Sequence, residues 1–347
     1  MSETQLTADR VRPYPTLDHI RVGIVGYGGA FNMGRRHGQS MELTGKMSVA
    51  AVCDLDPVRV ATAKEDFPSA RTFTDLATML ARVELDLVTV ILPHHLHAPV
   101  AMQCAEAGQH VVVEKPMCLS NAEAEQMIAA AQANHTMLSV FHNRRWDGDF
   151  MALREILCEK KLIGEVFHVE MFGGSHSRPR DWWRSTKAIS GGLFFDWGAH
   201  YLDWLLQLVE APVTGVTGFF HKLKWHECTN EDNVEAAIRF ANGCVAHVQW
   251  SALAMVSKER WRVLGTDGAV VSGEKSFKVT TELQGYRAQL EVPYRESAWD
   301  AYYANIAAHL SDGAELLVKP EQSQRVIAIM EAAELSSQTG VTQPLGC

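Results

Sequence analysis

The chain lacks a surplus of basic side chains, paired cysteines and long apolar runs, and each absence excludes a class of function. Its 347 residues carry 32 lysines and arginines against 41 aspartates and glutamates, for a formal net charge of -9. Because binding to phosphates requires excess positive charge, this balance argues against nucleic acid as the main partner. The seven cysteines are an odd number without a CxxC pair, which is typical of reduced, buried thiols and not of disulfide frameworks or zinc sites.

The absence of long apolar segments also bears on location. Residues 1–18 are polar and lack the apolar core of a signal peptide, and no later segment is apolar for long enough to cross a bilayer. We therefore expect a cytoplasmic protein without a membrane partner. With 47% hydrophobic and 21% charged residues, the composition is that of an ordinary globular protein, long enough for two domains.

The first half of the chain alternates short apolar segments with helix signals. Asp56 and Ser120 are expected helix N-caps, and Ser120 forms a capping box with Glu123. Thr74 is expected to cap a short helix. Strands that are apolar throughout and separated by helices predict a parallel sheet with both faces covered. The expected strands are residues 21–25, 47–53, 85–92, 111–113 and 137–141.

The second half shows a different pattern after an expected linking helix at residues 149–161. Asn242-Gly243 and Thr266-Asp267-Gly268 each separate two apolar segments and indicate hairpins. Helices are expected at residues 196–207, 300–310 and 321–336. These signals predict a mainly antiparallel sheet. One apolar face of it either covers helices or pairs with another subunit; its residues include Val234, Ala236, Ile238 and Phe240.

A glycine-rich turn after the first expected strand indicates a nucleotide site. Gly26 and Gly28 allow a tight turn and a close approach of the backbone to a pyrophosphate at a helix N-terminus, although Phe31 stands where a third glycine is usual. Asp54 ends the second strand, where a carboxylate binds the adenosine ribose, and Leu55 follows it instead of an arginine. NAD is therefore favoured over NADP.

The expected fold class is α/β, with an N-terminal Rossmann doubly wound parallel sheet and a C-terminal α/β domain with an open, mainly antiparallel sheet. We expect a polar tail at residues 1–19, the dinucleotide-binding domain at residues 20–146, and a substrate-binding and oligomerisation domain at residues 147–347.

Three polar side chains are candidates for chemistry. Lys115 ends an apolar strand, and ligands bind open α/β sheets beyond the carboxyl ends of strands. Asp196 and His200 are four residues apart, so on a helix they share one face, where the carboxylate can orient an imidazole that accepts a proton. The alternatives are a surface lysine and a helix N-terminus with one satisfied histidine.

Four motifs in order resemble the Gfo/Idh/MocA family of sugar and polyol oxidoreductases over roughly residues 20–340. They are the glycine turn, Glu114-Lys115-Pro116, Asn143-Arg144-Arg145-Trp146, and the Gly191-Gly192 to His200 block. The resemblance implies that Lys115 hydrogen-bonds the reacting hydroxyl and the nicotinamide ribose, that Asp196 and His200 contact the substrate, and that His200 accepts the proton. It also implies a homo-oligomer, a dimer or tetramer. Pro116 is expected to fix the direction of the lysine, through a cis bond.

The resemblance adds further residues on the cofactor side. His94 and His97 follow a strand where the family contacts the nucleotide, and Asn143 is either a site residue or a turn residue. Histidines 94, 95 and 97 are clustered, but no carboxylate or cysteine stands at local ligand spacing, so no metal is expected. The full cofactor set is Gly26, Gly28, Gly29, Ala30, Phe31, Asp54, Pro93, His94, His97, Glu114, Lys115, Asn143 and Trp183.

Three arginines beside two tryptophans precede the Gly-Gly block. Such a segment clamps an anion and stacks on a sugar ring, or it forms a solvated basic loop. The expected substrate contacts are Arg178, Arg180, Trp182 and Arg184, together with Lys115, Asp196 and His200.

Three functions follow from these residues. The first is NAD-dependent oxidation of a secondary hydroxyl of a sugar, a sugar derivative with an anionic group, or a cyclitol. The second is a redox-neutral glycosidase in which NAD oxidises a ring hydroxyl transiently, the aglycone is eliminated, water adds and the hydride returns. The third is a non-catalytic NAD-sensing protein, against which the presence of Lys115, Asp196 and His200 together argues.

Overall fold

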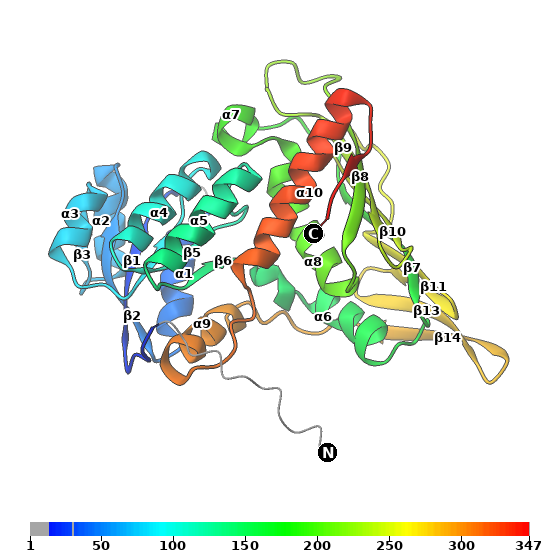
Figure 1. Cartoon of the computed structure of the whole chain (residues 1–347), viewed down its shortest axis with the longest axis horizontal. Coiled ribbons are helices and arrows are strands. Elements are labelled where there is room, and N and C mark those ends of the chain that lie inside the picture. The colour runs from blue at the N-terminus through cyan, green and yellow to red at the C-terminus, as the bar shows by residue number, and fades with distance from the viewer. Residues whose placement is uncertain (1–13, 30, 347) are drawn as a thin grey trace.

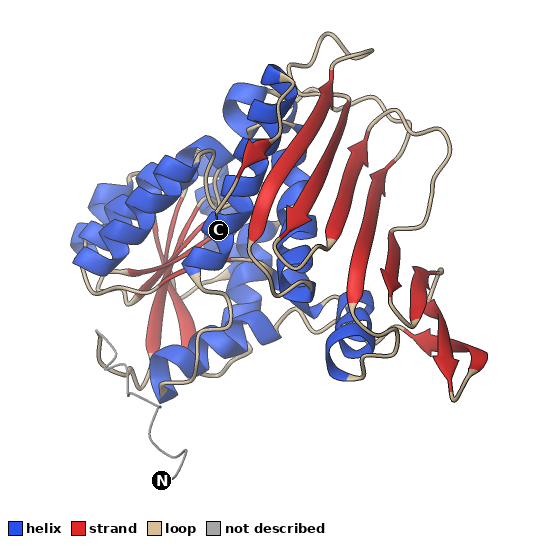
Figure 2. Ribbon diagram, turned by 45° about the vertical axis from the view of Figure 1, so that its right-hand side comes forward, coloured by secondary structure: helices blue, strands red, loops and turns tan. Residues whose placement is uncertain are grey.

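The computed structural model describes residues 14–29 and 31–346. They form two sheets side by side, one of six strands and one of nine (Figures 1 and 2). Most of the expected tail and Ala30, an expected cofactor contact, lie outside the described residues. No helix among those described has both the length and the apolarity needed to cross a membrane.

The first sheet is parallel, with the strand order β3-β2-β1-β4-β5-β6. Helices lie on both of its faces (Figure 2), as expected for strands that are buried on both sides. The strands are β1 (Ile20–Val25), β2 (Met47–Cys53), β3 (Arg71–Phe73), β4 (Leu87–Val90), β5 (His110–Val113) and β6 (Leu138–Val140). The helices are α1 (Met33–Glu42), α2 (Pro57–Asp66), α3 (Leu76–Arg82), α4 (His97–Glu106) and α5 (Asn121–Ala133).

Helix caps explain where these helices begin. Asp56 accepts a hydrogen bond from the backbone of Val58, and Ser120 accepts one from that of Glu123, as expected. The expected cap at Thr74 is wrong by one residue, because Asp75 accepts the bond from the backbone at position 78. A carboxylate is at least as good a cap as a hydroxyl, and here the neighbouring residue supplies it.

A link joins the two sheets and differs from the single helix expected at residues 149–161. It consists of a 3-10 turn (Asn143–Trp146), helix α6 (Gly148–Arg154) and a π-helical turn (Glu155–Glu159). The second sheet has the order β14-β13-β12-β11-β7-β10-β9-β8-β15. Strands β7 and β10 are parallel, while the other neighbouring pairs are antiparallel.

Both predicted hairpins of the second sheet are confirmed, by the β9–β10 and β11–β12 pairs. A short 3-10 turn, η4 (Trp183–Ser185), and a single turn of α-helix, α7 (Lys187–Ser190), precede the long helix α8 (Leu193–Leu208). The strands are β7 (Val166–Gly174), β8 (Val213–His221), β9 (Asn233–Phe240), β10 (Val245–Ser251), β11 (Trp261–Gly265), β12 (Gly268–Ser272), β13 (Ser276–Leu283), β14 (Tyr286–Pro293) and β15 (Gln343–Pro344).

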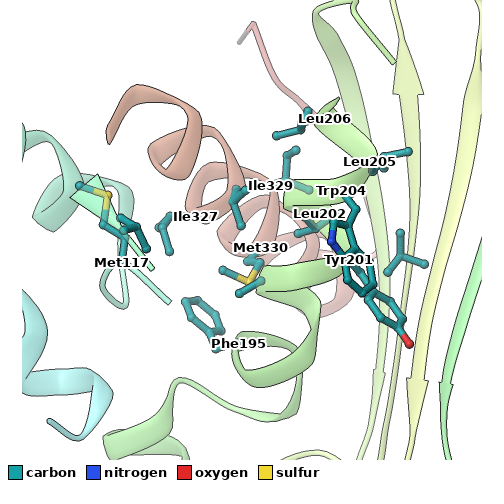
Figure 3. Packing of buried hydrophobic residues seen from close by; sticks show 14 of the residues in the cluster. Met117, Phe195, Tyr201, Leu202, Trp204, Leu205, Leu206, Ile327, Ile329 and Met330 are labelled. Carbon is teal, nitrogen blue, oxygen red and sulfur yellow. The ribbon is translucent and has the colours of Figure 1, made fainter. Parts of the chain in front are cut away.

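The apolar face of this sheet packs on helices of the same chain. Of the two alternatives for that face, covering helices or pairing with another subunit, the structure shows the first. Val234, Ala236 and Ile238 of β9 are fully buried in one cluster with α8 and with helix α10 (Pro320–Thr339). Figure 3 shows α10 side chains, including Met330, against those of α8. Five of the six described cysteines are buried, and all six are free.

Helix α9 (Ala301–Asp312) belongs to the far end of the chain but packs on the first sheet. Tyr302, Tyr303 and Ile306 are buried in one cluster with β1 and β2 residues. Figure 1 shows α9 below this sheet, beside α1. The two halves of the sequence are thus interlocked by one helix.

Candidate active site

Lys115 occupies the carboxyl end of β5, and its ammonium group is held by α8. Lys115 Nζ donates to the carboxylate Oδ1 of Asp196 at 2.7 Å and to the backbone oxygen of the same residue at 3.0 Å. The Lys115-Pro116 bond is cis, as expected. An ammonium group has three donors, so one N–H of Lys115 remains for another acceptor.

Asp196 is shared by two cations. Its Oδ1 also accepts from Nη1 of Arg184 at 2.7 Å. Burial alone would raise the pKa of this carboxyl, but the charges of Lys115 and Arg184 outweigh burial and hold the pKa well below its usual range. The carboxylate is therefore ionised at any working pH and fixes both cations.

His200 lies one turn along α8 from Asp196, but the expected pairing of the two side chains does not form. Asp196 is engaged by cations, and the buried Nδ1 of His200 has no hydrogen-bond partner among the described residues. Burial, and then the positive charge of Lys115, keep the pKa of His200 well below its ordinary value. The imidazole is thus neutral near pH 7 and able to accept a proton.

The histidines after β4 are buried close to this group. His94 donates from Nδ1 to the Ser190 carbonyl oxygen at 2.7 Å, and its Nε2 has no partner in the part of the chain that the structure describes. Both nitrogens of His97 meet backbone carbonyls, of Pro116 at 2.7 Å and of Leu92 at 2.9 Å. His97 therefore braces the turn that carries Lys115, while His94 is left with a free nitrogen.

The glycine turn has the shape that a pyrophosphate needs. Gly26 has a φ of 92°, and a side chain there would collide with the Ile91 carbonyl, whereas a Cβ at Gly28 would meet nothing within 4 Å. The first turn of α1 has no side-chain cap and no acidic residue. The helix N-terminus and an open backbone surface are thus available to an anion.

The missing third glycine is explained by a longer turn. Gly34, three residues after Phe31, packs so closely on Tyr27 that a Cβ there would lie 2.5 Å from the ring. Gly34 thus performs the helix-packing role that the motif assigns to its third glycine. Phe31 is half exposed and instead meets the ring of Trp182 at 5.6 Å between centroids.

Asp54 and Glu114, both expected to contact cofactor, already have protein partners. Asp54 accepts from the backbone N–H groups of Tyr27 at 2.6 Å and of Asp56 at 2.9 Å. Glu114 Oε1 is 3.0 Å from Nε2 of His37, and its Oε2 accepts from the backbone N–H of Lys115. The Asp54 carboxylate therefore stabilises the glycine turn, and the Glu114 carboxylate stabilises the turn that carries Lys115.

The arginine and tryptophan segment is divided between the site and the surface. The guanidinium of Arg184 lies over the ring of Trp183 at 4.6 Å, and Trp183 meets His94 edge-on at 4.9 Å. Arg178 instead forms an exposed ion pair with Glu227 at 2.8 Å. The structure thus brings Trp183 and Arg184 to Lys115, but not Arg178.

Several remaining residues have no side-chain contact that defines a role. Arg180 forms no ion pair within residues 14–29 and 31–346, and Asn143 begins a 3-10 turn without a side-chain hydrogen bond there. Pro93 precedes the turn that carries His94. In the same residues, no group of three His, Cys, Asp or Glu side chains is placed to hold a metal ion.

Two residues near the site were missed by sequence reasoning. His142 ends the strand segment before Asn143 and is almost completely buried near His200, with 6.4 Å between ring centroids. The sequence feature that could have indicated His142 is a polar residue directly after an apolar strand. Arg59 lies against the backbone of Gly29, so it adds positive charge beside the glycine turn. Nothing in its position, five residues after Asp54, indicated that Arg59 would lie beside the glycine turn.

Comparison with known proteins gives two matches to family models. Residues 20–142 match the model described as an oxidoreductase family with an NAD-binding Rossmann fold, and residues 150–271 match the GFO/IDH/MocA C-terminal domain. One relative is scyllo-inositol 2-dehydrogenase (NADP(+)) IolW of Bacillus subtilis, 28% identical over 92% of this chain and 94% of the relative.

Two solved structures extend the likeness to the whole chain. The structure described as "putative oxidoreductase yvaA" of Bacillus subtilis has a TM-score of 0.87 with 25% identity, covering 96% of this chain and all of that one. An NAD-binding protein of Listeria innocua has a TM-score of 0.84 with 28% identity, covering 95% and 97% of the two chains. The arrangement of a Rossmann sheet beside a mainly antiparallel sheet is thus shared along their full lengths.

Proposed function

The chain belongs to the GFO/IDH/MocA family of oxidoreductases, and from this premise we propose that it oxidises a secondary hydroxyl of a sugar or cyclitol. The observation that carries the proposal is the group of a fixed lysine, an ionised aspartate and a neutral buried histidine at the carboxyl edge of the first sheet. The relative named scyllo-inositol 2-dehydrogenase supports a cyclitol as the first substrate to test.

The residues present fit a nicotinamide dinucleotide. Gly26 and Gly28 form a turn with open backbone, the N-terminus of α1 is uncapped, and Asp54 stands at the end of β2. When bound, the nicotinamide takes up the hydride from the carbon that bears the reacting hydroxyl. We propose NAD as the preferred form because Asp54 would repel a 2′-phosphate, while Arg59 beside Gly29 and the NADP-dependent relative make NADP the alternative.

Two side chains handle protons in this scheme, and a third holds cations in place. The free N–H of Lys115 donates to the substrate oxygen, which lowers the cost of developing negative charge there. His200, neutral before the reaction, accepts the hydroxyl proton. Asp196 touches neither proton in this scheme; it keeps Lys115 and Arg184 in place.

The test is an absorbance assay with scyllo-inositol, other cyclitols and sugars, each with NAD and with NADP. We expect Lys115→Met to lower kcat/KM by about 10²–10⁴, the usual contribution of a positioned proton donor or acceptor. Lys64→Met is the matched control, because Lys64 also donates to two oxygens, the Pro68 and Ala70 carbonyls, but lies outside the site. Equal activity of the two variants would contradict the proposal.

A redox-neutral glycosidase is the second candidate, and the surplus of imidazoles favours it. His94 and His142, besides His200, are buried with a nitrogen that has no partner among the described residues, and elimination followed by water addition needs more acids and bases than one hydride transfer. The same assay with aryl glycosides separates the two. Aglycone release without accumulating NADH would favour the glycosidase.

We propose that Arg180 contacts an anionic group of the substrate. Arg178 and Arg184 already pair with carboxylates, so the earlier expectation of three clamping arginines reduces to one. A lower KM for a sugar acid than for the parent sugar, lost in Arg180→Met, would support this proposal.

We also propose a cytoplasmic homo-oligomer that uses the face of the second sheet turned away from α8. This face carries ion pairs, among them Glu170 with Arg262, and no helix covers it in Figure 2. Light scattering on the eluted protein would give the mass. A monomer would contradict the proposal.

A further inference from the structure

The loop between β8 and β9 is hydrogen-bonded to the segment that carries part of the candidate site. The backbone N–H of Thr229 donates to the Ser185 carbonyl at 3.1 Å, and the Thr229 hydroxyl accepts from the backbone N–H of Lys187 at 2.7 Å. The next two residues of the loop bond to the same segment, residues 184–193. The proposed chemistry uses this segment and assigns no role to the loop.

Asn230 fixes the backbone at two points of this segment. Its side chain is buried, with Nδ2 donating to the Arg184 carbonyl at 2.6 Å and Oδ1 accepting from the Ser190 hydroxyl at 3.2 Å. The Ser190 carbonyl is the acceptor of His94 Nδ1. One amide thus holds both Arg184, which pairs with Asp196, and the turn against which His94 rests.

Glu231 caps helix α8 from outside the helix. It is 8% exposed, and its Oε2 accepts from the backbone N–H of Leu193, the first residue of α8, at 3.0 Å. Gly192, at the N-cap position, has no side chain to accept this bond. A carboxylate here satisfies a donor that a helix leaves unpaired, and it lies at the positive end of the helix dipole.

The second glycine of the Gly-Gly pair is explained by this contact. Gly192 has a φ of 109°, and a Cβ there would lie 2.6 Å from Oε2 of Glu231. An alanine at this position would therefore displace the carboxylate as well as strain the backbone. Glycine at position 192 thus leaves room for an acceptor from the loop before β9.

Asp232 fixes the loop on its other side. It is fully buried, and its carboxylate accepts from the ammonium group of Lys222 at 2.9 Å and from the backbone N–H groups of Leu223 and Lys224, each at 2.7 Å. Because these bonds join the loop to the start of β9, Glu231 has little freedom to follow a displaced helix. The position of the first turn of α8 therefore depends on the loop.

The first turn of α8 transmits the contact to Lys115. Asp196 lies in this turn, and both acceptors of the Lys115 ammonium group, Oδ1 and the backbone oxygen, belong to Asp196. A shift of the turn would move both acceptors together, and with them His200, one turn later in the same helix. A misplacement of about 1 Å caused far from the reacting atoms can cost about 10²-fold in rate.

We infer that Glu231 is a positioning residue, which through the N-terminus of α8 keeps Asp196 bonded to Lys115. The bond to Leu193 carries this role. The inference rests on the proposed function and adds to it a residue that acts through the helix and not on the substrate.

Lys187 provides a matched control. Its ammonium group pairs with Glu231 and also with Glu334 of α10, the latter at 2.6 Å. Glu334→Met therefore removes one ion pair of Lys187, as Glu231→Met does, but leaves the bond to Leu193 in place. Glu231→Gln keeps a carbonyl oxygen for Leu193 and loses the charge. The three variants separate the hydrogen bond from the ion pair.

The variants are compared by kcat with scyllo-inositol or another cyclitol, and by the reactivity of Lys115. Reductive methylation with formaldehyde and cyanoborohydride, read by peptide mass spectrometry, gives the rate at Lys115 relative to that at Lys64, which lies outside the site. We expect Glu231→Met to lower kcat roughly 10- to 100-fold and to raise this ratio several-fold, because Asp196 no longer holds Lys115. Glu334→Met should stay close to the wild type, and Glu231→Gln should lose much less than Glu231→Met.

An unchanged methylation ratio in Glu231→Met, or an unchanged kcat where a cyclitol is oxidised, overturns the inference and leaves the proposed function standing. A structural role alone would lower only the melting temperature. Losses in Glu334→Met or Glu231→Gln equal to those in Glu231→Met also overturn it, because the ion pair or the charge would then carry the effect. If no polyol is oxidised, the proposed function fails, and the methylation ratio alone decides whether Glu231 positions Lys115. Glu231→Asp, whose carboxylate is one methylene short of Leu193, replaces Glu231→Met if the latter does not fold.

Discussion

At the scale of single residues, the site is organised by one carboxylate between two cations. Asp196 is one-third exposed, Lys115 is more deeply buried, and Arg184 lies between them and the tryptophans. Because Oδ1 accepts from both cations, the position of each depends on the same oxygen. Removing the charge of Asp196 should therefore disturb two groups at once.

We expect Asp196→Asn to lower kcat/KM by about 10²-fold or more, because a positioned lysine and arginine lose their common anchor. Stability should fall by about 1–3 kcal/mol, less than for a fully buried pair since the site is partly hydrated. Steady-state kinetics and urea unfolding measure the two effects. The control is Glu227→Gln, which removes the exposed partner of Arg178 and should change kcat/KM and stability little. Similar losses in the two variants would show that the site does not depend on Asp196 as an anchor for Lys115 and Arg184.

At the scale of elements, the β1–turn–α1 unit separates a folding role from a binding role. Gly26 is required by the backbone, because its φ is positive and a side chain would strike Ile91. Gly28 is not required by the unliganded fold, since a Cβ there has open space. Its absence of a side chain therefore matters only when something approaches the turn.

This difference gives a paired prediction. Gly26→Ala should lower the unfolding free energy by about 1–3 kcal/mol through strain, with cofactor binding impaired as a consequence. Gly28→Ala should leave the melting temperature almost unchanged and weaken NAD binding, because the methyl group occupies the surface for the pyrophosphate. Thermal unfolding without nucleotide and calorimetric titration with NAD measure these effects. Unchanged affinity in Gly28→Ala would place the pyrophosphate elsewhere.

The elements were largely predictable from sequence because their signals are local. Continuous apolar segments, the caps at Asp56 and Ser120, and the turn at Asn242-Gly243 each act within a few residues. The three-residue strand β3 was not predicted, since its pairing with β2 depends on the sheet and not on its own pattern. Gly34 was missed because the glycine motif places its third glycine at position 31. The turn in this chain is longer, so the glycine that packs against Tyr27 comes three residues later.

The site was predictable only in part because its contacts are non-local. Lys115 and Asp196 were both chosen from motifs, but they are separated by 81 positions in the sequence, and nothing in it indicated that they bond each other and leave the buried Nδ1 of His200 without a partner among the described residues. The competition is electrostatic: a carboxylate with two cations in reach does not turn to a neutral imidazole. His142 was missed because a single histidine after a strand does not indicate a role until the fold brings it next to His200, which is 58 positions later in the sequence.

At the scale of the whole molecule, buried neutral histidines link stability to pH. Burial is the main cause that lowers the pKa values of His94, His142 and His200 below the ordinary 6.5. The folded protein therefore keeps these rings neutral at pH values where the unfolded chain protonates them. Because the unfolded state then binds more protons, stability decreases as the pH falls.

We expect the free energy of unfolding to be highest above pH 6.5 and to fall steadily toward pH 4. The shift of His142 from 6.5 to about 4 corresponds to about 3 kcal/mol. Urea unfolding at pH 7.5, 5.5 and 4.5 measures the slope, and His142→Phe should make it shallower. A slope equal to that of the wild type would mean that folding does not lower the pKa of His142.

Helix α9 connects the order of synthesis to the order of folding. Residues 20–140 leave the ribosome first, but the core they form is completed by Tyr302, Tyr303 and Ile306. At 5–20 residues per second, translation needs roughly 10–30 s to reach α9 after β6 has emerged. Until α9 has been made, the apolar surface of the first sheet that Tyr302, Tyr303 and Ile306 cover is exposed to solvent. During that interval chaperones, and not the chain itself, are expected to protect it.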